Sequence, residues 1–109
     1  MYQLIATIVV AATQQLYQAQ VPTYGCNSSE NVTNLEKLRP TDEKTFQAQL
    51  AERVVQGDCV LFIRGSLVEG TDPDTAARLL HVQARLDPPG YISPLNDFKL
   101  NDGKEPAKP

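Results

Sequence analysis

The chain has 109 residues, of which 41% are hydrophobic and 21% charged, and its formal net charge is −3 at pH 7. This composition is typical of one globular domain and excludes wholesale disorder and a collagen-like repeat. Because Lys and Arg are scattered and outnumbered by Asp and Glu, we expect no nucleic-acid partner, since phosphate binding depends largely on clustered cations. About 75 residues remain for a core once the apolar start and polar end are set aside, which is a marginal size.

The first part of the chain belongs to a different class of sequence, because positions 1–29 contain no Asp, Glu, Lys or Arg. Residues 4–12 form an apolar run that is too short for a transmembrane helix of about 20 residues. The run fits the h-region of a secretory signal, with small residues before a cleavage point ahead of Thr13. The positive n-region is missing, so the alternative is a run that packs into the fold. We predict a signal-like segment and spacer over residues 1–23 and no stable membrane span.

Two helices are predicted next. Residues 13–20 are rich in Gln and contain no helix-start signal, so we interpret them as spacer and expect folded structure from about Tyr24. Polar residues at positions 27–29 can cap a first helix, and Val32, Leu35 and Leu38 recur at helical spacing before Pro40.

The second helix is predicted over residues 41–56. Thr41 can supply its N-cap, and Phe46, Leu50 and Val54 lie on one face at spacings of four. Gly57 can end it in the left-handed conformation.

The remaining chain predicts short strands. Residues 60–63 form a continuous apolar run, which is typical of a strand buried on both sides. Residues 67–69 predict a strand and residues 70–74 a loop. Over residues 79–86, Leu80 and Val82 alternate with polar neighbours and favour a strand. The alternative is a helix that begins at Pro73, with Asp72 as its N-cap. A reversal at residues 87–90 leads into a last strand over 91–93.

These elements predict an α+β fold in which two N-terminal helices pack on a small antiparallel sheet, and an SH3-like barrel is one form that such a sheet could take. We expect a single α+β domain over residues 24–95 and a loose polar tail over residues 96–109.

Cys26 and Cys59 are the two cysteines of the chain. In an exported protein they predict a structural disulfide, which would close a loop of about 34 residues. A catalytic redox pair is the rival interpretation, although such pairs usually lie closer in sequence, and free buried thiols are the alternative in a cytoplasmic protein.

The other candidate residues are few. His81 is the only histidine, and one imidazole with two paired cysteines makes no metal site, so we expect no metal and no cofactor. The aromatic residues predict mainly core packing. Tyr91, beside a Pro-Gly loop, and Phe62 are the candidates for a ligand groove, because small barrels bind peptides over exposed aromatic side chains.

The order of Tyr24-Gly25-Cys26, the helix with Phe46, and Gly57-Asp58-Cys59 with its strand is similar to a group of small exported proteobacterial proteins of uncharacterised function. The resemblance extends over roughly residues 24–93. It implies a disulfide-bonded periplasmic domain and no particular activity.

We therefore expect a non-catalytic interaction or accessory module, periplasmic or secreted, with a protein or peptide partner in the cell envelope. The alternatives are a thiol-dependent redox protein or small enzyme that uses Cys59, and a cytoplasmic regulatory barrel. An accessible thiol of low pKa would favour the enzyme.

Overall fold

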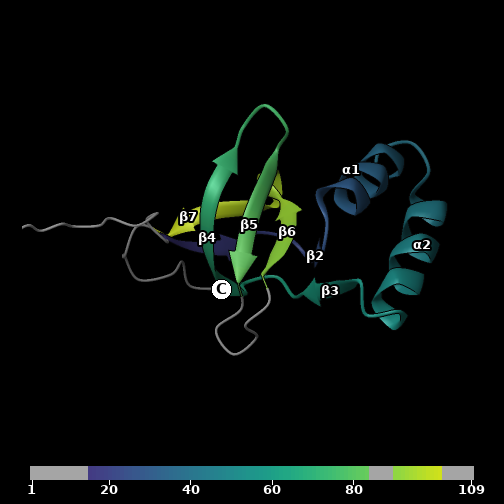
Figure 1. Ribbon diagram of the computed structural model, residues 1–109, viewed down its shortest axis with the longest axis horizontal. Helices are drawn as coiled ribbons and strands as arrows, with labels where there is room; N and C mark the ends of the chain where they lie inside the picture. The colour runs from purple at the N-terminus through teal and green to yellow at the C-terminus, as the bar shows by residue number, and fades with distance from the viewer. Residues whose placement is uncertain (1–14, 84–89, 102–109) are drawn as a thin grey trace, which may run out of the picture.

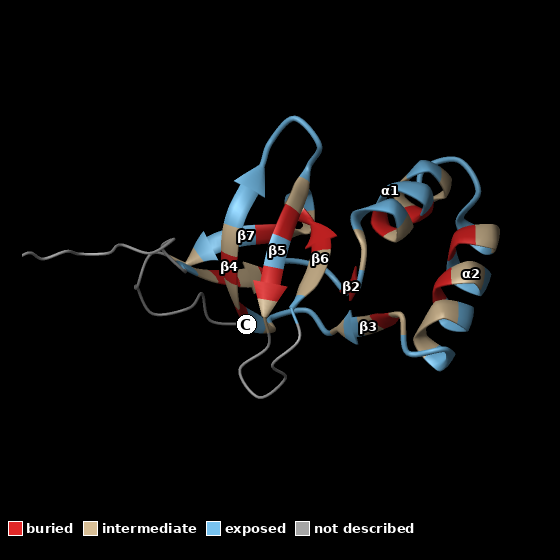
Figure 2. Ribbon diagram, viewed as in Figure 1, coloured by how far each residue is buried: buried red, intermediate tan, exposed pale blue. Residues whose placement is uncertain are grey.

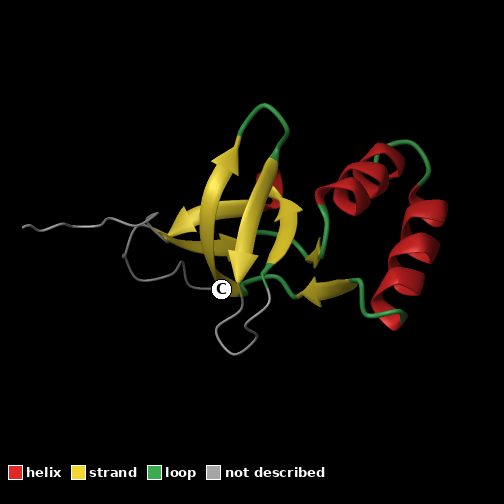
Figure 3. Ribbon diagram, viewed as in Figure 1, coloured by secondary structure: helices red, strands yellow, loops and turns green. Residues whose placement is uncertain are grey.

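The computed structural model describes residues 15–83 and 90–101. The strands in these ranges are β1 (Gln15–Ala19), β2 (Thr23–Cys26), β3 (Cys59–Phe62), β4 (Leu67–Asp74), β5 (Leu79–Gln83), β6 (Tyr91–Pro94) and β7 (Phe98–Asn101). The helices are α1 (Ser29–Leu38), α2 (Glu43–Val55) and the short 3₁₀ helix η1 (Leu95–Asp97) (Figures 1 and 3).

All seven strands belong to one antiparallel sheet, in the order β3-β2-β6-β5-β4-β1-β7. The two α-helices connect β2 to β3, which are neighbours in this sheet. They therefore form a helical hairpin inserted between two paired strands, and Figure 1 shows this hairpin at one end of the molecule, beyond the curled sheet.

Local capping explains where the helices begin. The Ser28 hydroxyl accepts a hydrogen bond from the Asn31 amide at 3.2 Å, and the Asp42 carboxylate accepts one from the Thr45 amide at 3.2 Å. The prediction that Thr41 caps the second helix is wrong. Its hydroxyl instead donates to the Lys37 carbonyl at 3.1 Å, because Thr41 closes the end of α1.

The buried residues of the described chain, red in Figure 2, form two groups. The helix cluster joins α1 and α2 to β2 and β3, and its buried members are Tyr24, Cys26, Val32, Leu35, Phe46, Leu50 and Cys59. The sheet cluster fills the inside of the curled sheet, and its buried members are Tyr17, Ala19, Val68, Leu80, Val82 and Phe98. The chain is thus α+β, with one small core beneath the helical hairpin and a second within the sheet.

The predicted fold class is wrong in its order of elements, because β1 and β2 precede the helices. β1 lies in the stretch predicted to be spacer and pairs with both β4 and β7. Its inward residues are Tyr17 and Ala19, an aromatic and a small side chain among glutamines, and this pattern does not resemble an apolar strand. An SH3-like barrel is not confirmed.

The prediction that residues 60–63 are buried on both sides is also wrong. β3 is an edge strand, and Leu61 and Ile63 are 61% and 76% exposed. The helical hairpin covers the strand at Cys59 and leaves the later apolar side chains uncovered.

β4 continues through residues 70–74, which the sequence predicted as a loop. Gly70 allows this, because a Cβ at this position would lie 2.6 Å from the ring of Tyr17 on β1. The strand pairing is irregular between Thr71 and Asp74, and Asp72 has a φ of 52°.

The strand predicted over residues 79–86 is confirmed for Leu79–Gln83, and the last predicted strand is found as β6. The predicted reversal at residues 87–90, and the end of the strand before it, lie almost entirely outside the described residues. β6 is followed by η1 and β7, so residues 96–101 are not a loose tail. In the ranges described, no helix has both the length and the apolar character needed to cross a membrane.

Candidate functional site

The helical hairpin is closed at its base by a disulfide between Cys26 and Cys59. Cys26 is the last residue of β2 and Cys59 the first of β3, and the two are direct cross-strand partners. Both lie in the helix cluster, and their exposed fractions are 0% and 1%. The bond therefore has a structural place in the core, and its burial does not support the thiol chemistry at Cys59 that the sequence left open.

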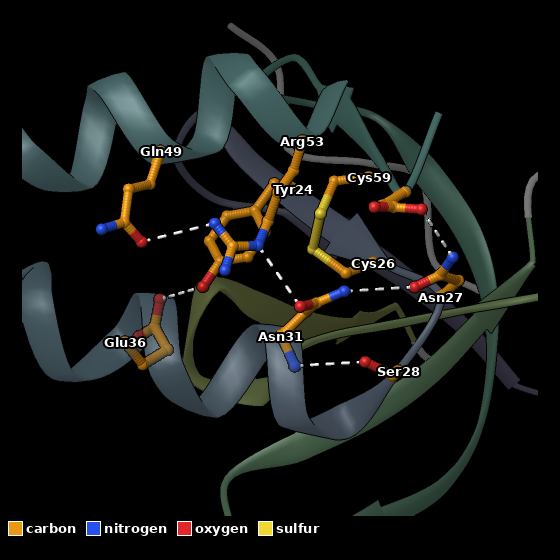
Figure 4. The surroundings of a disulfide bond; sticks show 10 residues. Tyr24, Cys26, Asn27, Ser28, Asn31, Glu36, Gln49, Arg53 and Cys59 are labelled. Carbon is orange, nitrogen blue, oxygen red and sulfur yellow. Dashed lines mark hydrogen bonds between the residues drawn. A yellow bond between two sulfur atoms is a disulfide. The ribbon is translucent and has the colours of Figure 1, made fainter. Parts of the chain in front are cut away.

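A chain of side-chain hydrogen bonds runs beside the disulfide and joins α1 and α2 to the loop residues next to the two cysteines (Figure 4). The Asn27 amide donates to Asp58 at 3.2 Å, and the Asn31 amide donates to Asn27 at 3.3 Å. Arg53 on α2 then donates to Asn31 and to Gln49, at 3.3 Å in each case. This chain connects both helices to the base of the hairpin.

A cleft of about 410 Å³ lies where α1 approaches the β4–β5 turn and the end of β6. It is open to solvent, and its size is within the usual range for small-molecule and peptide sites. Its lining residues come from three separated parts of the chain: Thr33, Glu36, Lys37, Arg39 and Pro40, then Ala77, Arg78 and Leu79, then Pro94 and Asn96.

One wall of this cleft is held by an ionic network centred on Arg39. Its Nη1 contacts Glu36 Oε2 at 3.0 Å and Asp97 Oδ2 at 2.7 Å. The hydroxyl of Thr23 also donates to Asp97 at 2.7 Å, and the hydroxyl of Tyr24 donates to Glu36 at 2.6 Å. The network thus ties α1 to η1 and to β2, across the boundary between the helical hairpin and the sheet.

Burial and charge set the protonation of this network. Burial raises the pKa of Tyr24 well above its usual value, and the hydrogen bond to Glu36 adds to the effect. Burial alone would lower the pKa of Arg39, but its bonds to Asp97 and Glu36 outweigh this, and the Arg39 pKa is raised. The guanidinium also lies 5.7 Å from the ring centre of Phe46. Tyr24 therefore stays neutral and Arg39 stays charged.

The lining of the cleft is positively charged, although the protein as a whole is acidic. Lys37, Arg39 and Arg78 line it together with the single carboxylate of Glu36, so its lining carries a formal charge of +2 while the chain carries −3. Arg39 forms ion pairs with two carboxylates, whereas neither Lys37 nor Arg78 has an ion-pair partner within the residues that the structure describes. Arg78 also has a φ of 61°, a conformation that is uncommon outside glycine and is enriched at functional positions.

The aromatic residues predicted for a ligand groove lie elsewhere. Phe62 and Tyr91 are partly buried, pack against the sheet cluster and approach Gly25. Neither lines the cleft, so a groove over these two residues stays a prediction. No sequence signal could have indicated the cleft, because its cations come from positions 37, 39 and 78 and form no motif.

His81 is exposed on β5, on the face opposite Leu80 and Val82, and its Nδ1 lies 3.9 Å from a carboxylate oxygen of Asp72. Both side chains are more than half exposed. In the described part of the chain, no group of His, Cys, Asp and Glu side chains is arranged to hold a metal ion.

Comparison of the chain with protein-family models, with curated proteins and with solved structures gave no match. The resemblance to small exported proteobacterial proteins therefore stays a prediction. The disulfide is compatible with an oxidising location.

Proposed function

We propose that this protein is a non-catalytic, exported interaction module that binds an acidic peptide segment of a partner protein in the cleft between α1 and the β4–β5 turn. The observation that carries the proposal is the convergence of Lys37, Arg39 and Arg78 on an open cleft of about 410 Å³ in a protein of net charge −3. The partner is expected in the periplasm or outside the cell.

The lining suits a peptide better than a free inorganic anion. Pro40, Ala77, Leu79 and Pro94 supply apolar surface between the cations. A peptide that alternates acidic and apolar side chains can contact both kinds of surface, with charge fixing its orientation and apolar contact adding affinity.

Arg39 has a positioning part in this site. Its ion pair with Asp97 holds the end of α1 against η1, and this contact fixes the distance between the wall that carries Lys37 and the wall that carries Arg78. Lys37 and Arg78, which are exposed and have no ion-pair partner among the described residues, are then the groups that contact the peptide carboxylates.

Binding is tested by calorimetry with a blocked glutamyl-leucyl-glutamyl tripeptide, and with the corresponding glutaminyl peptide as the uncharged control. We expect a Kd on the order of 100 μM to 1 mM for the acidic peptide, because the site offers only two free cations. Affinity should fall as salt is added, since these charges are exposed.

Charge reversal locates the site. Lys37→Glu and Arg78→Glu should each weaken binding about tenfold, which corresponds to roughly 1.4 kcal/mol. Lys44→Glu is the matched control, because Lys44 is exposed on α2 and does not line the cleft. Equal binding of the acidic and glutaminyl peptides, or full affinity in the Lys37→Glu/Arg78→Glu variant, would refute the proposal.

Export is tested separately by the intact mass of the protein, expressed in a bacterial host from its natural upstream region and alkylated without reduction. We expect a chain that begins near Thr13, is lighter by two hydrogens and resists alkylation at both cysteines. A full-length chain alkylated at Cys26 and Cys59 would contradict export.

A further inference from the structure

The lining of the cleft contains one carboxylate among its cations. Glu36 lines the cleft together with Thr33 and Lys37, and spacings of three and four place these residues on one face of α1. The Glu36 side chain is 34% exposed, so it contacts both solvent and the protein. A peptide that carries only negative charge would pair with Lys37 and Arg78 and leave this carboxylate unused.

The two oxygens of the Glu36 carboxylate have different surroundings. Oε2 accepts hydrogen bonds from the Tyr24 hydroxyl at 2.6 Å, which Figure 4 shows, and from Arg39 Nη1 at 3.0 Å. In the described part of the chain, no hydrogen bond or ion pair uses Oε1. The two donors therefore hold the side chain in place, while Oε1 keeps its capacity to accept a hydrogen bond from a ligand.

The charges around Glu36 do not balance. Arg39 pairs with both Glu36 and Asp97, so one guanidinium faces two carboxylates and this group has an excess of one negative charge. Lys37 and Arg78 are the cations of the lining that have no ion-pair partner among the described residues. The cleft therefore offers a ligand one place for a cation, at Glu36, beside two places for anions.

We propose that Glu36 binds the free α-ammonium group of the peptide, so that the partner segment is the N-terminus of a protein that begins with acidic residues. This inference rests on the proposed function. The first acidic side chain of the segment pairs with Lys37, next to Glu36 on α1, and a later one crosses the cleft to Arg78. Capture of a terminal amine is one of the recurring modes of peptide recognition.

An α-ammonium group suits this arrangement better than a lysine side chain. It lies on the backbone directly beside the first acidic side chain, as Glu36 lies beside Lys37, and binding it orders no long flexible side chain of the peptide. Removal of signal peptides also leaves new N-termini on exported proteins. Such ends are therefore present in the periplasm or outside the cell, where the partner is expected.

The test compares peptides with and without the amine by calorimetry. Glutamyl-leucyl-glutamyl amide is used with a free and with an acetylated N-terminus, together with the two corresponding glutaminyl peptides. The free amine makes the acidic peptide less negative, so attraction to the cations alone would weaken its binding. We expect instead that the free peptide binds about three- to fivefold more tightly at about pH 6.5, a gain typical of a partly exposed ion pair.

This gain should depend on the charge of the amine. In the wild-type chain it should be lost as the pH rises through about 8, the ordinary pKa of a peptide α-amino group, and the acetylated peptide should show no matching change. Both peptides meet the same charged and titratable groups around Glu36, which are Tyr24, Lys37, Arg39, Arg78 and Asp97. The difference between the peptides therefore reports the amine alone.

Glu36→Gln separates a contact with the peptide from a structural role. The variant keeps a side-chain oxygen for Tyr24 and Arg39 but removes the charge. The free peptide should then bind less tightly and the acetylated peptide at least as tightly, because the lining becomes more positive. A loosened cleft wall would weaken both. Glu30→Gln is the matched control, because Glu30 is exposed on α1 outside the cleft, and it should leave the ratio of the two Kd values unchanged.

Three results would overturn the assignment. One is a free peptide that binds no better than the acetylated peptide at about pH 6.5. Another is a gain that persists in Glu36→Gln. The third is an equal gain from an acetylated lysyl-glutamyl-leucyl-glutamyl amide, which would assign the site to a lysine side chain. In each case the acidic-peptide site stands if the acidic peptides still bind better than the glutaminyl peptides, and it falls if they do not.

Discussion

Removal of the disulfide should cost a large part of the stability of this protein. Cys26 and Cys59 are 33 positions apart, and closing a loop of this length lowers the entropy of the unfolded chain enough to stabilise the fold by about 3.8 kcal/mol at 25 °C in the loop-entropy model. The Cys26→Ala/Cys59→Ala variant should lose about this amount. For a chain of this size the loss corresponds to a fall of the melting temperature by roughly 15–30 °C.

The measurement is urea unfolding followed by circular dichroism, with the wild-type protein under reducing conditions as a second sample that keeps both sulfur atoms. The location of the bond adds a second expectation. Because both cysteines belong to the helix cluster, amide hydrogen exchange should accelerate more in α1 and α2 than in β4 and β5. A loss below about 1 kcal/mol, or acceleration that is uniform over the chain, would refute the reasoning.

Three further changes test the packing and the ionic network. A Cβ at Gly25 would lie 2.7 Å from the Oγ of Ser93, so Gly25→Ala should lower the free energy of unfolding, measured in urea, by about 1–3 kcal/mol. The loss should be smaller in a Ser93→Ala background, and equal losses in both backgrounds would exclude this contact as the cause. The pKa of Tyr24 is raised in the folded state, so the stabilisation from its neutral phenol is complete below about pH 10, and above this pH the free energy of unfolding should fall by about 1.4 kcal/mol per pH unit. Tyr24→Phe should remove this part of the dependence of the unfolding free energy on pH, and an unchanged dependence would be inconsistent with a neutral buried phenol. Arg39→Met leaves the carboxylate of Asp97 without its cation, and the Asp97 side chain is only 14% exposed. The free energy of unfolding should therefore fall by about 1–3 kcal/mol, and by less in an Asp97→Asn background. The same loss in both backgrounds would show that the ion pair is not its source.

The helices could be predicted from the sequence because their signals are local. A capping side chain before α1 and apolar residues at helical spacing, such as Phe46 and Leu50, act within a few residues of each other. The Cys26–Cys59 pairing could also be predicted, because the chain has only two cysteines.

The order of the sheet could not be predicted, because it depends on distant partners. Tyr17 and Ala19 become a buried strand face only when β4 and β7 lie on either side of β1. The same holds for β3, whose apolar residues predict a central strand although no other described strand flanks its outer side. An apolar run indicates that a strand is present, but it does not show whether other strands pair with it on one side or on both.

The cleft was not predictable for a related reason. Its cations lie on α1 and on the β4–β5 turn, and Asp97, which positions Arg39, follows β6. In the sequence these are scattered charges on expected surface positions. Only the docking of the helical hairpin against the sheet brings them to one place.

The most direct test of the proposed site is the map of amide chemical-shift changes when the blocked glutamyl-leucyl-glutamyl tripeptide is titrated into the isotope-labelled protein. We expect saturable shifts at Lys37, Arg39, Arg78 and Leu79, from both walls of the cleft, and none with the glutaminyl peptide. Shifts centred on Phe62 and Tyr91 would move the site to the groove predicted from the sequence. That result, or the absence of saturable shifts, would contradict the assignment of acidic-peptide binding to this cleft.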